Sequence, residues 1–390
     1  MPSYISSNNN RFYVALETSY GNAASVAPQH RIPAVKLTAR QQTEKTQRKD
    51  KTGTRTFLGD PVGLRRLTDF DITTYMTGWA DQTQAPPHGA LFQACLGGAP
   101  VSSPGGTVAS SGTPTTIAFT AAHGLAPGAA VVSNSEMRFV TAVVDSKTVL
   151  VNAPFSTQPQ AGGVTTPSMT YTPAEELSSA TIYDYWSPTT AAQRLLSGAA
   201  VDKLSVKVNS DLHQFEFSGQ ASDLVDSTSF QGQQAGLTQY PAEPAVAGLN
   251  YSIIPGHLGQ VWLGAAPAQF FTLTAADLTL NNGLQLRAQE FGSQYPRAIA
   301  PGIRTVALDF AVFQMDDTAT AALYQAARQR SPISVMLQLG QQQGQLFGIY
   351  MKSVVPQVPQ FDDSQSRLQW RFQTNRAQGG ANDELYIAFG

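Results

Sequence analysis

The chain has 390 residues, of which only 13% are charged, and its formal net charge is −2. A nearly neutral chain has no overall field that attracts nucleic acid or an anionic membrane, and its single cysteine excludes an internal disulfide framework and a cysteine-based zinc site. The length suffices for two or three domains, and its richness in Gly, Pro, Ser, Thr and Gln favours strands and turns over helices.

The N-terminal segment begins MPSYISSNNNRFYV, which lacks the basic and then apolar pattern of a secretory signal. No apolar run approaches the ~20 residues that a transmembrane helix needs. We therefore expect a β-rich protein that is made inside the cell and has no membrane span. Residues 1–32 are predicted to form an N-terminal arm.

Four sequence blocks recur in the same order along the chain, which favours a duplicated domain over two unrelated β-domains of similar composition. The pairs are AVKLTAR (34–40) with FFTLTAA (270–276), GLRRLTDFDITTYM (63–76) with GIRTVALDFAVFQM (302–315), GALFQAC (89–95) with AALYQAA (321–327), and the strand pair in 202–221 with that in 349–374.

Each copy predicts the same local elements. Residues 305–312 alternate small or polar with apolar side chains at the strand period of two, and residues 69–74 do the same in the first copy. The third block predicts a short helix, for which residues 316–318 (Asp-Asp-Thr) offer N-cap oxygens in the second copy. The repeating unit is therefore a strand, a long loop, a strand, a helix and an antiparallel strand group.

An insertion distinguishes the first copy from the second. Residues 101–172 have Gly/Ser/Thr/Pro-rich flanks and predict a small all-β module inserted at a loop. The first repeat then comprises 33–100 and 173–222, a connector spans 223–268, and 269–390 form the second repeat with a C-terminal arm. We predict an α+β, mainly β fold, with two tandem β-sandwich or barrel domains that each carry one flanking helix.

Side chains suited to catalysis are sparse. No two of the five histidines have the spacing of metal ligands. DFD at 69–71 places two carboxylates on one face of a strand, where they could bind a cation, but the absence of an evident third ligand favours a polar strand face. No phosphate-binding loop, nucleophile elbow or Cys/His pair occurs. The sequence predicts neither an enzyme nor a cofactor.

The most charged passage is QQTEKTQRKDKTGTRTF (41–57). A nucleic-acid grip would need aromatic residues among the basic ones, and only Phe57 qualifies. The corresponding loop 277–302 keeps the length and loses most of the charge, and loops this long are usually functional or disordered. We therefore favour contact with a neighbouring subunit over a solvated flexible loop or a nucleic-acid grip. The candidate contact residues are Lys45, Arg48, Lys49, Lys51 and Arg55.

The chain resembles the major tail tube proteins of long-tailed, non-contractile bacteriophages. The resemblance is carried by RFYVALETSYGNAASVAP (11–28), by the strand–loop–strand unit from IPAVKLTAR to TDFDITTYM, by the GALFQACLGG helix and by the closing hairpins. It covers both repeats but not 101–172. It implies sandwich or barrel domains in rings whose inner sheets form a continuous wall, with the long loop reaching an adjacent ring.

Two tube domains per chain imply a homotrimeric ring with pseudo-sixfold symmetry, stacked into a tube that conducts the genome in the virion tail and assembled in the host cytoplasm. The implied partners are further copies of the chain and the tape measure, terminator and distal tail proteins. Genomic DNA should pass through the lumen without specific binding. The wall that faces it should therefore be polar or mildly acidic, because clustered Lys and Arg would bind the phosphates. Asp69, Asp71, Glu216 and Asp309 are candidates to face the lumen, with exposure to the outer solvent as the alternative. The N-terminal arm and the C-terminal NDELYIAFG (382–390) are expected to bridge subunits.

Two other interpretations remain open at this point. The chain could be another tail ring component, such as a terminator, a baseplate ring protein or a contractile-type tube, because these share the unit of a sheet with one helix. It could also be a surface-binding module whose insertion recognises carbohydrate, although 101–172 holds only four aromatic residues, Phe119, Phe139, Phe155 and Tyr171. An enzyme with a site formed across the repeats has the least support.

Overall fold

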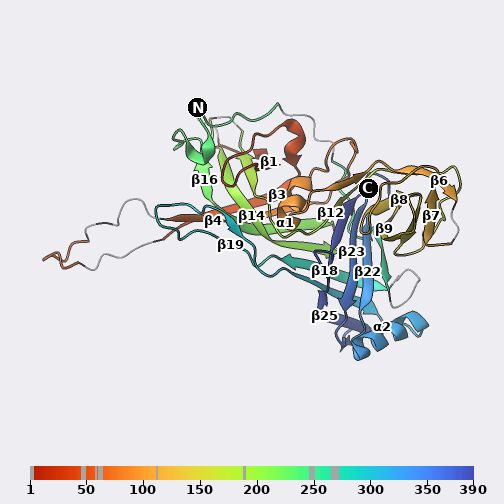
Figure 1. The fold of residues 1–390 in the computed structure, drawn as a ribbon. Helices are drawn as coiled ribbons and strands as arrows, with labels where there is room; N and C mark the ends of the chain where they lie inside the picture. The colour runs from red at the N-terminus through yellow and green to blue at the C-terminus, as the bar shows by residue number, and fades with distance from the viewer. Residues whose placement is uncertain are drawn as a thin grey trace.

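A computed structural model describes residues 4–44, 50–57, 59, 65–110, 113–187, 190–245, 251–264 and 272–390. In this part of the chain the fold is mainly β, with two α-helices, a large antiparallel sheet and a separate six-stranded sheet (Figure 1). The predicted fold class is confirmed at this level. Lys45, Arg48 and Lys49 lie outside the described residues.

The strands of the large sheet form two sets that follow one another along the chain. The first strand set consists of β1 (Arg11–Leu16), β3 (Ala34–Thr43), β4 (Arg66–Tyr75), β13 (Ala180–Tyr185), β14 (Arg194–Val208), β15 (Gln214–Ala221) and β16 (Asp223–Asp226). The second strand set consists of β17 (Gly259–Leu263), β18 (Leu273–Asn281), β21 (Thr305–Phe313), β22 (Ile333–Leu339), β23 (Phe347–Val355), β24 (Gln360–Asp362), β25 (Gln369–Ala377) and β26 (Tyr386–Phe389).

The two sets have the same order of strand pairing. The first runs β1-β13-β14-β15-β4-β3, with β16 also paired to β14. The second runs β17-β22-β23-β25-β21-β18, with β26 also paired to β23. Helix α1 (Gly89–Leu96) follows β4, and helix α2 (Thr318–Gln329) follows β21 at the corresponding place. The two sets are joined edge to edge, because β14 pairs with β18 over six residues.

The joined strands make one long sheet with a polar face and an apolar face. Its order is β3-β4-β15-β14-β18-β21-β25, and β24 pairs with the outer edge of β25. Alternation along these strands buries one side chain of every two, as in β21, where Val306, Leu308, Phe310 and Val312 are buried. The predicted alternation in 305–312 and 69–74 is confirmed.

Helix α1 packs where the two strand sets meet. The Phe92 ring lies 5.1 and 5.2 Å from the rings of Phe215 and Phe217 in β15, and 5.4 and 5.5 Å from those of Phe347 and Phe389 in the second set. Aromatic pairs at these distances add stabilisation beyond their buried area. In contrast, α2 lies at the far end of the second set (Figure 1). Its predicted cap is present, because the Asp317 carboxylate accepts a hydrogen bond from the Thr320 amide at 2.7 Å.

The inserted segment forms a nearly closed six-stranded sheet. Its order is β11-β6-β7-β10-β9-β8, and a bridge between Val132 and Thr166 joins β8 to the end of β11. At its base, β5 pairs with β12, and β12 also pairs with β26. The bounds are β5 (Val101–Ser103), β6 (Gly106–Ser110), β7 (Thr116–Phe119), β8 (Ala130–Ser133), β9 (Glu136–Val143), β10 (Thr148–Val151), β11 (Val164–Thr165) and β12 (Ser168–Tyr171).

This inserted barrel docks on the second strand set rather than on the set that carries it. Phe139 stacks on Tyr350 of β23 with ring centroids 5.3 Å apart, and the amide of Met137 donates to the Gln338 side chain of β22 at 2.7 Å. The buried Arg138 guanidinium pairs with Glu136 and lies 3.9 Å from the centre of the Trp262 ring of β17. The insertion therefore covers an apolar face of the second set.

The predicted N-terminal and C-terminal arms both contain strands that pair within this chain's own sheet. Within 1–32, β1 pairs with β13 along its whole length, and β2 (Arg31–Ile32) pairs with β1. At the C-terminal end, β26 pairs with both β23 and β12. The expected connector 223–268 likewise contains β16 and β17. These segments lack strong alternation in the sequence, and their pairing depends on partners distant in the chain.

Candidate functional site: the polar face and its two edges

The four carboxylates singled out in the sequence lie on the polar face of the long sheet. Asp69 and Asp71 of β4 and Asp309 of β21 alternate with the buried Phe70, Ile72 and Phe310. Glu216 of β15 is paired with Thr73 of β4, which follows Asp71 on the same face. The strand order thus brings residues from both halves of the sequence onto one surface, which the sequence pattern alone could only suggest.

Two cations of the long sheet have an anionic partner close by. Lys207 Nζ lies 3.3 Å from Glu216 Oε1, and Arg371 Nη2 lies 2.5 Å from Asp362 Oδ2. Exposed pairs of this kind add little to stability, but they reduce the positive charge that a polyanion would meet. These pairs give the polar face a mixed charge.

Acidic side chains also stand next to one another across the joined strands. Asp277 of β18 is directly opposite Asp309 of β21 in the strand register. Burial, together with the nearby Asp309 and Glu216 carboxylates, raises the pKa of Asp277. A shallow depression of about 460 Å³ lies over this region. In the part of the chain that the structure describes, no group of three or more His, Cys, Asp or Glu could hold a metal ion.

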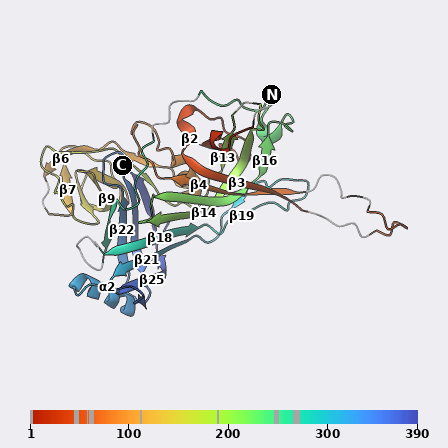
Figure 2. The same cartoon turned by 180° about the vertical axis from the view of Figure 1, so that it is seen from behind.

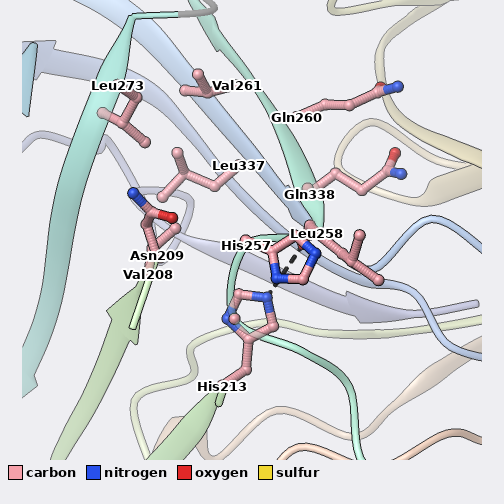
Figure 3. Close-up of a pocket in the computed structure, with 12 residues that line it drawn as sticks. Val208, Asn209, His213, His257, Leu258, Gln260, Val261, Leu273, Leu337 and Gln338 are labelled. Atoms are coloured by element: carbon pink, nitrogen blue, oxygen red, sulfur yellow. Dashed lines mark hydrogen bonds between the residues drawn. The ribbon is translucent and has the colours of Figure 1, made fainter. Parts of the chain in front are cut away.

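A smaller pocket of about 170 Å³ lies at the end of β14 and contains two histidines, His213 and His257 (Figure 3). The His213 ring Nε2 is 3.1 Å from the Leu258 carbonyl oxygen, and burial lowers the pKa of this histidine. The backbone here ties the end of the first strand set to the segment that leads into β17, because the His213 amide donates to the Ile254 carbonyl and the Met76 amide donates to the His213 carbonyl. The pocket is therefore explained by the crossing of the chain between the sets.

The long sheet ends in two edges with unused backbone groups. Among the described strands, β3 pairs along its length only with β4, and β24 pairs only with β25. Apolar side chains are exposed at both edges: Val35 at β3 is 49% exposed and Phe361 at β24 is 60% exposed. Phe361 stacks on Trp370 with centroids 5.7 Å apart. Exposed apolar edge strands are surfaces on which another chain can pair.

The charged loop projects from one end of the long sheet. Residues 50–57 lie far from the rest of the chain in two opposite views (Figures 1 and 2), and all eight are exposed. Of the candidate contact residues, Lys51 and Arg55 belong to this exposed segment. The predicted counterpart loop, 277–302, begins within β18 (Leu273–Asn281), and its later residues lie beside the first strand set, where the Gln294 carbonyl accepts from the Arg66 amide.

Comparison with known protein families gives a match over nearly the whole chain. The model of the family described as phage tail tube protein matches residues 7–387. The chain belongs to the phage tail tube protein family. Membership makes it a structural, non-enzymatic component of the virion tail that self-assembles with tail proteins. No curated protein sequence matches the chain.

As a member of this family the chain is a structural protein, and the sheet face and the two edges are its candidate assembly surfaces. In the described part of the chain, no helix is long and apolar enough to span a bilayer. Sequence reasoning missed the β24 edge and Phe361. The signal was present in QFDDSQSRLQW (360–370), where Phe361, Leu368 and Trp370 are the apolar residues of a short hairpin.

Proposed function

We propose that three copies of this chain close a ring with pseudo-sixfold symmetry and that such rings stack into a non-contractile tail tube. The observation that carries the proposal is the β14·β18 pairing, which joins two strand sets of the same topology edge to edge. A duplicated tube domain accounts for this arrangement. The same junction repeated between chains would close the sheet, and closed assemblies leave no open edges.

The edges left open correspond to the edges already joined inside the chain. In the first set β14 flanks β15, with Leu204 opposite Phe217. In the second set β24 flanks β25, with Phe361 opposite Trp370. The free strand β24 therefore corresponds to the C-terminal half of β14, and the free strand β3 corresponds to β18. We propose that β24 of one copy pairs with β3 of the next.

The internal junction also gives the register of this contact. Inside the chain, Ser205 of β14 is opposite Thr279 of β18. Asp362 corresponds to Ser205, because both follow the apolar residue that faces β15 or β25. Gln42 corresponds to Thr279, because each lies two residues after the residue that is opposite Asp69 or Asp309. Asp362 of one copy would then lie opposite Gln42 of the next, with Arg40 two residues further along. An arginine diagonal to an aspartate is a favourable cross-strand pair.

The polar face would form the wall of the lumen, with Asp69, Asp71, Glu216 and Asp309 directed toward the passing genome. DNA must slide past this wall, so a surface that lacks free clusters of Lys and Arg suits the task. The exposed segment that contains Lys51 and Arg55 would contact the neighbouring ring, together with Lys45, Arg48 and Lys49. The tape measure, terminator and distal tail proteins would be its other partners.

Ring formation can be tested by electron microscopy and by a cysteine pair. The variant Gln42→Cys with Asp362→Cys should form disulfides between copies, since paired Cα atoms of antiparallel strands lie within disulfide range. On a non-reducing gel the covalent ladder should end at three chains, whereas six chains would contradict the trimer. Cys95 is fully buried and should stay silent.

The chain offers its own matched control for this experiment. Ser205→Cys with Thr279→Cys occupies the corresponding positions of the internal junction and should form a disulfide within one chain. If the control forms its disulfide while the test pair does not, the proposed edge contact is wrong. If micrographs of the unmodified protein at high concentration show only single chains, the proposed ring itself is wrong.

A further inference from the structure

The two long loops of the chain have different surroundings, although the sequence repeat makes them counterparts. Residues 50–57 of the first loop extend away from the molecule (Figures 1 and 2). The second loop forms a hairpin of β19 (Gln285–Leu286) and β20 (Ile299–Ala300) and returns to the base of the first. Because the two loops differ, a ring of three chains would have three projecting loops and three loops that fold back, rather than six equivalent loops.

The tip of the second loop binds the backbone of β4. The Arg66 amide donates to the Gln294 carbonyl at 2.9 Å, and the Arg65 guanidinium is 3.5 Å from the Gln289 carbonyl. β15 pairs with β4 only as far as Ala221, which is opposite Thr68. The second loop therefore satisfies the β4 backbone just where β15 has turned away, at the base of the projecting finger.

A buried carboxylate joins these segments. Asp223 of β16 is 7% exposed and accepts a hydrogen bond from the Gln41 side chain of β3 at 2.9 Å. The Tyr295 side chain of the second loop lies close enough to Asp223 to lower the pKa of this carboxyl group. Close by, the buried Ser222 hydroxyl donates to the Pro296 carbonyl at 3.3 Å. Both strands that carry the finger are thus bonded to the same small cluster.

The corresponding place in the second strand set is already occupied by its own side chains. Glu384, just before β26, pairs with the Arg304 guanidinium at 2.5 Å. Arg304 also donates to the Asn382 side chain at 2.6 Å and to the Ala174 carbonyl at 2.9 Å. The carboxylate that would receive a tyrosine hydroxyl there has an arginine partner instead. In the proposed ring, the first loop of a neighbouring copy would lie beside the second strand set. It would meet no site there like the one around Asp223.

We infer that the two long loops of each chain form one composite arm, in which hairpin 285–300 braces the first loop at its base, where the Glu44 amide donates to the Arg65 carbonyl. The inference rests on the proposed stacking of rings and adds that a ring presents three braced arms to the next ring, not six equivalent loops. The brace holds the base of the finger in place before docking. Ordering in advance lowers the conformational entropy lost when the arm meets its partner, a second copy of the chain in the next ring.

The test uses a brace variant, Ser222→Ala with Tyr295→Phe, which removes two hydroxyls at the contact between the loop and the first strand set. Its matched control is Arg287→Gln, which removes an exposed ion pair with Glu290 within the hairpin itself. In hydrogen exchange, the peptide containing Arg66 should exchange about tenfold faster in the brace variant and at the original rate in the control. Unchanged exchange in the brace variant would overturn the brace.

The consequence for assembly is measured on the same proteins. Brace-variant rings should form as in the unmodified protein, and their stacks should be shorter in electron micrographs, while the control stacks normally. An averaged image of the tube without imposed symmetry should show three inter-ring arms per ring, each containing residues 50–57. Six identical arms, or stacks of unchanged length in the brace variant, contradict the composite arm, whereas absence of rings from the unmodified protein as well contradicts the proposed function.

Discussion

At the scale of single residues, the environment of Asp223 departs most from what its sequence neighbourhood implies. Nothing in SDLVDS (222–227) distinguishes Asp223 from Asp226, yet Asp226 caps an exposed turn and Asp223 is buried beside three segments. Burial raises the pKa of Asp223 to about 6, although hydrogen bonds and Arg66 oppose the shift. A carboxyl group of this kind binds a proton more tightly in the folded than in the unfolded chain.

Asp223 should therefore make stability depend on pH in a defined direction. Its contribution is favourable while the group is protonated and is lost as the pH rises from about 4 to about 6, where only the folded chain still binds the proton. Asp223→Asn removes this dependence. In urea unfolding at pH 4, 5, 6 and 7, the free energy of unfolding of the variant relative to the original should rise by about 2 kcal/mol across this range. Parallel curves for the two proteins would show that the group titrates normally.

At the scale of elements, the alternation and capping signals of the sequence predicted local structure well. They did not predict which strands pair with one another. The strand over 305–312 and the Asp317 cap of α2 followed from spacing alone. The sequence predicts a connector over the residues of β17, because GQVWL is short, and its burial depends on pairing with β22 and on the inserted barrel that covers Trp262. The site was predicted in the same uneven way: the polar face followed from alternation, but the open edge at β24 required knowledge of the strand order.

The docking of the inserted barrel also could not be predicted from the sequence, because it depends on shape. Gly348 of β23 leaves room for the barrel. A methyl group at this position would lie 2.3 Å from the Met137 sulfur and 3.0 Å from the Phe139 ring. Two flat β surfaces approach this closely only where one of them lacks a side chain. The insertion therefore acts as a cover for the second strand set rather than as a separable decoration.

Gly348→Ala tests this cover. Overpacking the interface should lower the free energy of unfolding by about 1–3 kcal/mol. Binding of a hydrophobic dye should increase as the barrel loosens from Trp262 and Tyr350. Gly380→Ala is the control, since a methyl group there meets nothing within 4 Å. Equal stability of the two variants would mean that the barrel adjusts without cost and does not seal this face.

At the scale of the whole molecule, the proposed tube has to let DNA pass without holding it. The chain has only a slight net charge, so the behaviour of the lumen depends on where charges lie and not on their total. On the polar face, carboxylates from both strand sets stand beside the cations of β14 and β25, as in the pair Lys207–Glu216. Neutralising these carboxylates would free the cations without altering the buried face of the sheet.

The triple variant Asp69→Asn, Asp71→Asn and Glu216→Gln should therefore turn a passive wall into one that retains DNA. It changes the net charge of each chain from −2 to +1, because three negative charges are removed. Assembled tubes of the variant should retain short duplex DNA at low salt in a sedimentation assay and release it as salt rises, since the attraction depends on phosphate counterions. A variant of equal net charge, Glu176→Gln, Asp211→Asn and Asp316→Asn, changes carboxylates away from these positions and should retain no more DNA than the original. Equal retention by the two variants would show that the polar face does not line the passage.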